Sequence, residues 1–275
     1  MRLINRKPSR SLAVVLALLP FLALLLAYMA GSAARLADNP ADKLLPALTK
    51  VAESAVRLAT EEDKRSGAVL LWADTGASLA RLGMGMGLSI ALGLVVGMLT
   101  GLLPHARAGL APFVAILSLI PPLAILPILL IVFGLGELSK VALIVVGITP
   151  FLIRDMSQRA MEVPPEQLVK AQTLGASSWV LAVRVVLPQV LPRLIQATRL
   201  ALGPAWLFLI AAEAIAATEG LGYRIFLVRR YLAMDVILPY VIWITLLAFC
   251  LDWGLRTLSR KAFPWSLTEP GGDAP

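Results

Sequence analysis

Hydrophobic runs alternate with short charged segments along most of this chain. The runs cover residues 11–30, 82–103, 139–153, 195–217 and 236–251, and a sixth, rich in proline, starts near residue 108. A helix of about 20 apolar residues crosses the ~30 Å hydrocarbon core of a bilayer. The pattern predicts an all-α, polytopic membrane protein with six transmembrane helices.

Basic residues precede the first run, and the small residues Gly31, Ser32 and Ala33 follow it. Cleaved signal peptides share this arrangement, but their hydrophobic regions are usually about 7–15 residues long. The run at 11–30 is longer, which favours an uncleaved helix. We therefore expect residues 1–35 to form a cytoplasmic tail and the first span.

Acidic and basic residues mix between residues 36 and 81, which is typical of a segment outside the membrane. Within this segment apolar residues recur at helical spacing, at Leu44, Leu48, Val51, Ala52, Ala55 and Leu58. Such a stripe predicts an amphipathic helix. We expect it to lie on the external membrane surface or against the bundle.

Small residues recur every four positions in the second run, at Gly85, Ser89, Gly93, Gly97 and Gly101. They form a helix face that is almost free of side chains, so another helix can approach closely. That helix belongs either to the same chain or to a second copy. Packing within the chain is the favoured interpretation.

Three prolines, Pro121, Pro122 and Pro127, interrupt the third run. A helix broken at membrane depth is tolerated where protein or an aqueous cavity surrounds it. These prolines are therefore candidates for lining a translocation path, and a kinked packing helix is an equal alternative. Glu213, an acid within an apolar run, is a further path candidate; alternatively it lies at the outer interface near Glu219.

Residues 163–192 form the longest polar interruption in the second half of the chain. Pro164 and the proline after it suit a first helical turn, Gly175 suits a left-handed position after the helix, and Ser177 suits the N-cap of a second helix. Pro188 is expected to interrupt that second helix. The sequence predicts a helix–glycine–helix hairpin.

Composition supports a membrane protein, because 59% of the 275 residues are hydrophobic, 15% are charged, and mean hydropathy is +0.82. The formal net charge of +8 does not indicate nucleic-acid binding, since the basic residues lie mainly at the ends of hydrophobic runs. With one cysteine, Cys250, and one histidine, His105, we expect no intrachain disulfide and no metal site.

Charge also predicts the topology. Lys170, Arg184 and Arg193 place the hairpin in the cytoplasm, and both termini with it. Three arginines between the fifth and sixth runs count against this topology: Arg224, Arg229 and Arg230.

Sequence motifs for covalent chemistry are missing: there is no G-x-x-x-x-G-K-[ST], no G-x-S-x-G and no H-E-x-x-H. The chain is therefore expected to be a transport protein and not an enzyme. A channel or an ion-coupled secondary carrier is the alternative, with Glu213 and Asp252 as its few intramembrane acids. Asp252 is expected to pair with Arg256, one helical turn later.

Ala171, Gly175 and the sequence Val185-x-Leu187-Pro188 resemble the EAA motif of ABC importer permeases. Further stretches resemble the nitrate, sulfonate and taurine group of these permeases, namely 120–140, 191–206, 212–223 and the closing Pro264-Trp265.

The resemblance implies a type I (MetI-like) permease core at 82–260, a cytoplasmic coupling loop at 163–192 and a cytoplasmic tail at 261–275. The residues that it implies for coupling to an ATPase are Ala171, Gly175, Ala176, Ser177, Ser178, Trp179, Leu187 and Pro188. Where the motif often has Glu-Ala, this chain has Val169-Lys170.

Partners are implied as well: an ABC ATPase that holds ATP and Mg, an external solute-binding protein, and a second copy of the permease in a homodimer. The resemblance implies no cofactor on this chain, and it implies contact with the lipid of a bacterial cytoplasmic (inner) membrane. The implied solute is nitrate, a sulfonate or taurine, with guanidine-like or urea-like compounds as alternatives.

Overall fold

A computed structural model describes residues 8–40, 42–63 and 67–265 of the chain, and apart from one isolated bridge its regular secondary structure is helical. The all-α prediction is therefore confirmed. The helices fall into two compact units. One combines the chain up to Val69 with Val228–Val241, and the other combines Leu70–Leu227 with the chain from Ile242 onward.

The first unit contains α1 (Arg10–Asp38) and α2 (Leu48–Thr60). Two side chains of α1 fix the segment before α2, because the Tyr28 hydroxyl donates to the carbonyl of Pro46 at 2.7 Å and the Ser32 hydroxyl donates to that of Leu45 at 2.9 Å. The first hydrophobic run is thus helical, as predicted, and its helix extends beyond residue 30.

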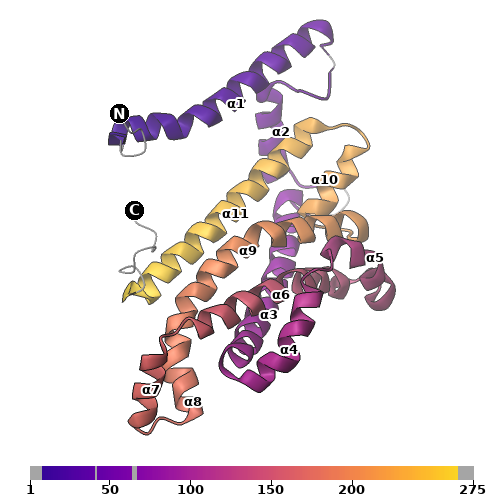
Figure 1. Cartoon of the computed structure of the whole chain (residues 1–275). Coiled ribbons are helices and arrows are strands. Elements are labelled where there is room, and N and C mark those ends of the chain that lie inside the picture. The colour runs from indigo at the N-terminus through magenta and orange to yellow at the C-terminus, as the bar shows by residue number, and fades with distance from the viewer. Residues whose placement is uncertain (1–7, 41, 64–66, 266–275) are drawn as a thin grey trace. The chain divides into compact units, whose positions relative to one another are not determined.

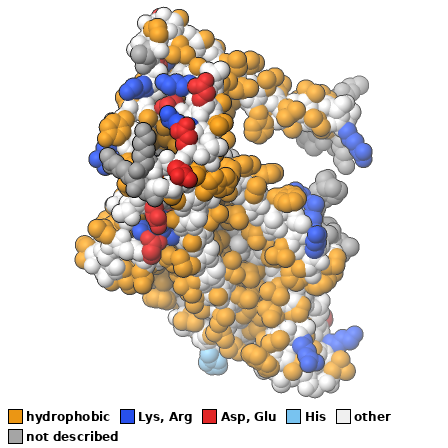
Figure 2. Space-filling view, turned by 180° about the vertical axis from the view of Figure 1, so that it is seen from behind, with side chains coloured by type: hydrophobic (Ala, Val, Ile, Leu, Met, Phe, Trp, Pro, Cys, Tyr) orange, Lys and Arg blue, Asp and Glu red, His pale blue; other side chains and the backbone are white. Residues whose placement is uncertain are grey.

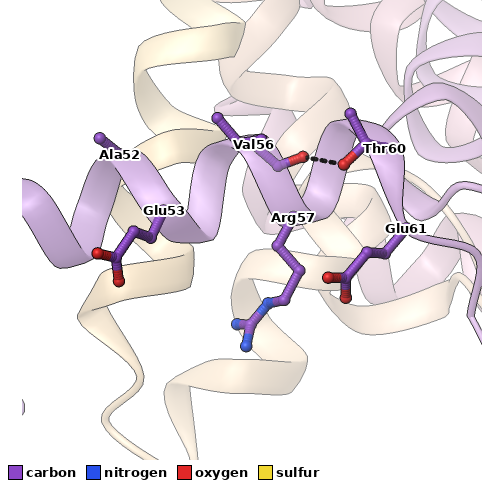
Figure 3. Close-up of a pocket in the computed structure, with 6 residues that line it drawn as sticks. All are labelled: Ala52, Glu53, Val56, Arg57, Thr60 and Glu61. Carbon is purple, nitrogen blue, oxygen red and sulfur yellow. Dashed lines mark hydrogen bonds between the residues drawn. The ribbon is translucent and has the colours of Figure 1, made fainter.

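The predicted amphipathic helix is α2. Val51 and Ser54 are buried on one face, where the Ser54 hydroxyl donates to the carboxylate of Asp235 at 3.3 Å. The opposite face is open and carries Ala52, Glu53, Val56, Arg57, Thr60 and Glu61 (Figure 3). Five of the six belong to α2 and Glu61 is its C-cap residue, so this pocket is a shallow hollow on a solvated helix surface.

The helices of the second unit begin with α3 (Leu70–Leu102), α4 (Pro104–Leu117), α5 (Pro122–Phe133) and α6 (Glu137–Met161) (Figure 1). They continue with α7 (Pro165–Thr173), α8 (Ser178–Val180), a π-helical turn (Leu181–Val186) and α9 (Leu187–Ala216). The last two helices, α10 (Leu221–Arg229) and α11 (Met234–Ala262), contribute residues to both units.

The core of the second unit is α6, which packs against both α3 and α9. Its side chains at Leu143, Ile144, Ile148, Leu152 and Met156 are at most 2% exposed. Hydrophobic side chains cover most of the surface in the view of Figure 2, and charges gather in a few clusters. An apolar surface of this extent suits lipid, because a soluble monomer rarely exposes large apolar patches.

The small-residue stripe of α3 faces α6. A Cβ added at Gly93 would lie 2.5 Å from the Cβ of Leu152, and one added at Gly97 would lie 2.5 Å from that of Met156. These distances confirm packing within the chain, and successive glycines meet successive turns of α6, so the two helices run parallel.

The proline-rich third run is broken, as predicted. Helices α4 and α5 meet at an angle of 95°, with Pro121 extended ahead of α5 and Pro122 as its first residue. Pro127 lies inside α5. A proline ring clashes with the preceding helical turn, which accounts for the break at this point.

Among the described residues, four helices are long and apolar enough to cross a membrane: α1, α3, the continuous helix from Ser178 to Ala216, and α11. The bent pair of α4 and α5 would be a fifth span. The expected sixth, within α6, is helical and its residues 139–153 are largely buried. A count of six spans stays a prediction.

Pro188 does not interrupt the second hairpin helix, contrary to the prediction. The helix continues through a π-helical turn into α9, and the N–H of Leu187 bonds to the carbonyl of Ala182, five residues back. A π-turn is wider than an α-turn, which accommodates the proline without ending the helix.

The predicted pairing of Asp252 with Arg256 is also wrong. Arg199 of α9 binds the Asp252 carboxylate with two bonds, from Nε at 2.8 Å and from Nη2 at 3.1 Å. A guanidinium on a facing helix can bind a carboxylate with two parallel hydrogen bonds. An arginine four residues later on the same helix favours only a single contact.

The α3–α6 contact predicts that alanine substitutions at two glycines of α3 change the stability of the protein in opposite directions. Gly97→Ala is expected to destabilise the protein by about 1–3 kcal/mol, because the new methyl group overlaps Met156. Gly87→Ala meets nothing within 4 Å and is expected to stabilise by roughly 0.5–1 kcal/mol. Thermal unfolding in detergent measures both; equal melting temperatures would contradict the packing.

Candidate functional site

A tight glycine turn shapes the hairpin at 163–192. Gly175 has a φ of +84°, in the left-handed region, and its N–H donates to the carbonyl of Gln172 at 2.9 Å. The N–H of Ala176 donates to the carbonyl of Ala171 at 3.0 Å. This pair of bonds is a Schellman motif, and the predicted role of Gly175 is confirmed.

The second helix of the hairpin starts as predicted. The Ser177 side chain accepts the N–H of Val180 at 3.3 Å and so caps the helix. The two arms are joined at their base as well, because the Gln189 side-chain amide donates to the Oε1 of Gln167 at 3.0 Å. The hairpin is therefore held at its tip and at its base.

Large apolar side chains project from the hairpin tip. Leu174 is 80% exposed and Trp179 is 76% exposed. Both side chains stand on the surface of the hairpin, at the end away from the helical core. The residues implied for coupling included Trp179 but not Leu174.

The other residues expected to couple to an ATPase divide into two groups. Gly175, Ser177 and Ser178 are exposed at the tip. Ala171, Ala176, Leu187 and Pro188 are half-buried, so they shape the hairpin more than they offer a surface.

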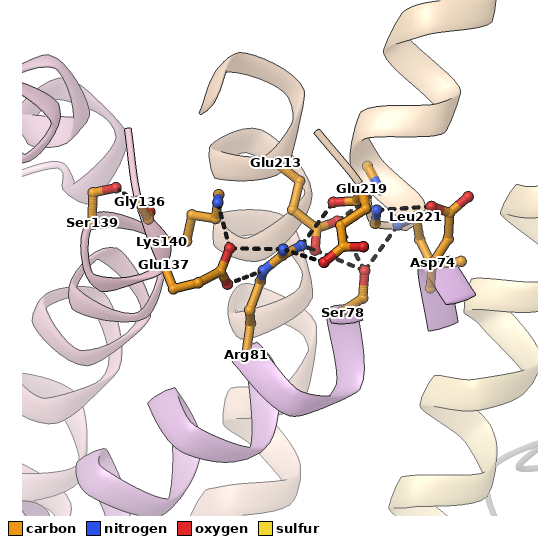
Figure 4. Close-up of polar contacts among 12 residues, drawn as sticks. Asp74, Ser78, Arg81, Gly136, Glu137, Ser139, Lys140, Glu213, Glu219 and Leu221 are labelled. Carbon is orange, nitrogen blue, oxygen red and sulfur yellow. Dashed lines mark hydrogen bonds and ion pairs between the residues drawn. The ribbon is translucent and has the colours of Figure 1, made fainter. Parts of the chain in front are cut away.

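A second polar site lies at the other end of the core, where α3, the start of α6 and the end of α9 meet (Figure 4). At its centre is Arg81, whose side chain is 2% exposed. Its guanidinium donates to Glu137 with two bonds, from Nε at 2.5 Å and from Nη2 at 2.9 Å. Its Nη1 donates to Glu213 and to the carbonyl of Glu219, both at 2.8 Å.

Glu213 is fully buried in this cluster. Besides Arg81, its carboxylate accepts the Ser78 hydroxyl at 2.7 Å and the N–H of Gly222 at 2.8 Å. Arg81 thus links Glu213 to Glu219, and a position of Glu213 at the outer interface stays a prediction. None of its bonding partners is one of the prolines Pro121, Pro122 and Pro127.

Asp74 extends the same cluster towards α10. Its carboxylate is 1% exposed and accepts Arg224 Nε at 2.9 Å and the N–H of Gly220 at 2.9 Å. Gly220 has a φ of +123°, and an added Cβ would lie 2.6 Å from the Cδ of Glu213. The turn before Tyr223 is therefore fixed to α3 by side-chain bonds.

The ion pairs of the cluster join three cations to four carboxylates, that of the exposed Glu219 included. Lys140 Nζ donates to Glu137 Oε1 at 2.8 Å, so Glu137 joins two cations. Glu137 precedes the hydrophobic stretch of its helix, and the hydrogen bond from Arg81 lowers the pKa of its carboxyl from 4.5 to about 2. Glu137 is therefore an anion at neutral pH.

Sequence reasoning flagged Glu213 but missed Arg81, which lay in a segment interpreted as external. The available signal was the spacing of Asp74, Ser78 and Arg81, which puts three polar side chains on one helix face. The helix α3 begins at Leu70 and includes all three. Among the described residues, no group of three or more His, Cys, Asp or Glu side chains could hold a metal ion.

An all-α membrane protein with a capped, exposed hairpin at one end of a buried helical core fits the class that the sequence led us to expect, a transport subunit that another protein drives. Comparisons with known proteins agree. The family described as "Binding-protein-dependent transport system inner membrane component" matches residues 89–263.

Two relatives illustrate the similarity. The taurine transport system permease protein TauC of Escherichia coli (strain K12) is 37% identical over 195 residues, which cover 71% of each chain. The bicarbonate transport system permease protein CmpB of Synechococcus elongatus is 32% identical over 194 residues, 70% of this chain and 69% of that one.

A solved structure supports the fold. An inward-facing form of the MetNI methionine ABC transporter matches with a TM-score of 0.62 and 21% identity, covering 72% of this chain and 99% of that chain.

The chain belongs to the family of binding-protein-dependent transport system inner membrane components. It is a permease subunit of a bacterial ABC importer in the inner membrane, and its ATPase and solute-binding protein are separate subunits. This assignment takes the place of the channel or ion-coupled carrier that the sequence left open.

The buried cluster yields a prediction for its central cation. Arg81→Gln leaves the fully buried Glu213 without its cation, which is expected to cost about 3–5 kcal/mol. Glu219→Gln is the control, because that side chain is 59% exposed, lies 3.8 Å from Arg81 and is expected to cost less than about 1 kcal/mol.

Melting temperature and the yield of monodisperse protein in detergent measure both variants. Equal melting temperatures for Arg81→Gln and Glu219→Gln would show that the cluster does not hold these helix ends together.

Proposed function

We propose that two copies of this chain form the transmembrane pathway of an importer for a small polar anion, and that the hairpin at 163–192 transmits the motion of the ATPase. ATP and Mg bind to the ATPase in this scheme. The single observation that carries the proposal is the hairpin itself: a turn fixed by backbone bonds, with exposed Leu174 and Trp179 at its tip.

The hairpin is suited to transmit force because little of it is free to bend. The Schellman bonds at Gly175 fix one end, the Gln167–Gln189 contact fixes the base, and the second arm is continuous with α9. A displacement of the tip would therefore move α9 and would not be absorbed in a loop.

The translocation path is proposed to run beside the bend between α4 and α5. Pro121 and Pro127 are exposed there, as a path lining requires, and the bend leaves backbone groups of residues 118–121 outside regular helix. Glu213, in contrast, is buried, since its carboxylate is enclosed by its own chain. In the proposed function Glu213 holds the outer ends of the helices, and the prolines line the path.

The solute is proposed to be a small oxyanion or a zwitterion with an anionic group. This rests on the names of two relatives, a taurine and a bicarbonate transport permease, whose substrates share that chemistry. Uptake of labelled taurine, sulfonates, nitrate and bicarbonate by cells with and without this chain tests the class directly. Uptake of none of them would reject the solute assignment and leave the subunit assignment intact.

Gly175 should accept only residues that tolerate its left-handed backbone. Gly175→Val is expected to strain the turn by more than the roughly 1–2 kcal/mol typical of an L-residue and to uncouple ATP hydrolysis from uptake. Gly175→Asn is the matched control, because asparagine adopts this conformation readily. Uptake and ATPase rates in proteoliposomes measure coupling; equal coupling in both variants would contradict a rigid hairpin.

Trp179 is expected to be a main contact for the ATPase. Trp179→Ala should weaken association by about 2 kcal/mol, or roughly 30-fold, as for a buried aromatic at an interface centre. Trp253→Ala is the control, since that tryptophan is 62% exposed on α11 and outside the hairpin. The affinity of each purified variant for the ATPase subunit, measured by biolayer interferometry, distinguishes Trp179→Ala from Trp253→Ala. Equal losses would place the ATPase contact elsewhere.

A further inference from the structure

A pocket of about 300 Å³ lies at the base of the hairpin, away from its exposed tip. Four parts of the second unit line it: the end of α6, the start of α7, the start of α9, and the segment after α11. The polar lining residues are Arg159, Glu162, Gln167, Gln189 and Arg193, and Trp265 forms one wall. The hairpin tip, which the proposed function uses, contributes none of them.

Hydrogen-bond donors dominate this pocket. Arg159 donates from Nη1 to Glu162 at 2.9 Å, while its Nε is buried without a hydrogen-bond partner and lies 3.8 Å from the carboxylate of Asp155. The Gln167 side-chain oxygen is occupied by Gln189 at 3.0 Å, so Gln167 presents its NH₂ group.

The charge of the lining is positive. Two guanidinium groups, those of Arg159 and Arg193, face one carboxylate, that of Glu162. That carboxylate is already engaged, because it accepts Arg159 Nη1 on one oxygen and the Gln158 amide, at 3.3 Å, on the other. Donors therefore outnumber acceptor oxygens in the lining, where Gln189 Oε1 is the other side-chain acceptor and Arg193 Nη1 also donates to Gln196 at 3.4 Å.

We propose that this pocket binds a small oxyanion with a sulfonate, sulfate or phosphate group between Arg159 and Arg193. Planar guanidinium groups bind such anions with paired hydrogen bonds. The Gln167 NH₂ group supplies a further donor, and the volume suits a ligand near the small end of the range for ligand pockets.

The position of the pocket means that a bound anion would connect two helices. Arg159 belongs to α6 and Arg193 belongs to α9, so an anion held by both joins the ends of the two helices between which the hairpin is inserted. The anion could be free in the cytoplasm or could be the phosphate of a lipid headgroup, because the bonding chemistry is the same. The proposal does not depend on which solute is imported or on whether the ATPase contacts Trp179.

The test uses the purified full-length chain, without the ATPase, in nanodiscs made only of zwitterionic lipid. Sodium sulfate and sodium phosphate are titrated by calorimetry against sodium chloride at equal ionic strength. We expect saturable binding of at least one of them, weakened tenfold or more in the double variant Arg159→Gln/Arg193→Gln. Arg260→Gln, which removes an exposed cation outside the pocket, should bind as the unmodified chain does.

A second arm distinguishes the sources of the anion. If nanodiscs with anionic lipid abolish sulfate binding, the site takes a lipid headgroup; if binding persists, it takes a free anion. Melting temperatures of the variants show that they are folded. Absence of saturable binding in zwitterionic nanodiscs, or equal binding by the double variant and the unmodified chain, would overturn the proposal.

Discussion

The close contact between α3 and α6 determines the arrangement of both polar sites. Lipid gives two apolar helices no hydrophobic reason to associate, so the attraction comes from near-backbone packing along the glycines of α3. The same contact fixes the register of the two helices. At one end Arg81 meets Glu137, and at the other Gly101 packs against Ala160, directly before the hairpin. This one helix–helix contact thus positions both the buried charge cluster and the base of the hairpin.

The charge cluster is tolerable only because its bonding is nearly complete. A buried guanidinium or carboxylate costs several kcal/mol unless geometry and additional hydrogen bonds offset its desolvation. Arg81 has two carboxylates and a carbonyl, and Glu213 has a cation, a hydroxyl and a backbone N–H. Such mutual dependence makes the adjoining ends of α3, α6 and α9 a unit, since no single charged residue can be removed without leaving another one unpaired.

Local features of the chain were predictable from sequence, and contacts between distant segments were not. The glycine turn at 175, the cap at Ser177 and the break before α5 follow from local backbone chemistry, and each is present. The pairing of Asp252 with Arg199 joins residues far apart in sequence, so helical spacing pointed to the wrong partner. Pro188 was misjudged for a related reason: a proline predicts an interruption, but a π-turn can absorb it.

A single helix, α9, connects the two polar sites and continues through its internal prolines Pro192 and Pro204. It has 30 residues, which at about 1.5 Å each span roughly 45 Å, from the hairpin arm at Leu187 to beyond Glu213. The π-turn keeps the arm continuous with this helix across Pro188. A motor that acts on the hairpin would therefore act on the far end of α9 as well, where Glu213 is bonded to α3. Under the proposed function, this continuity explains how a distant ATPase could open the path beside the bend between α4 and α5. The helix α9 transmits the displacement of the hairpin, and the buried cluster makes the neighbouring helices move with α9.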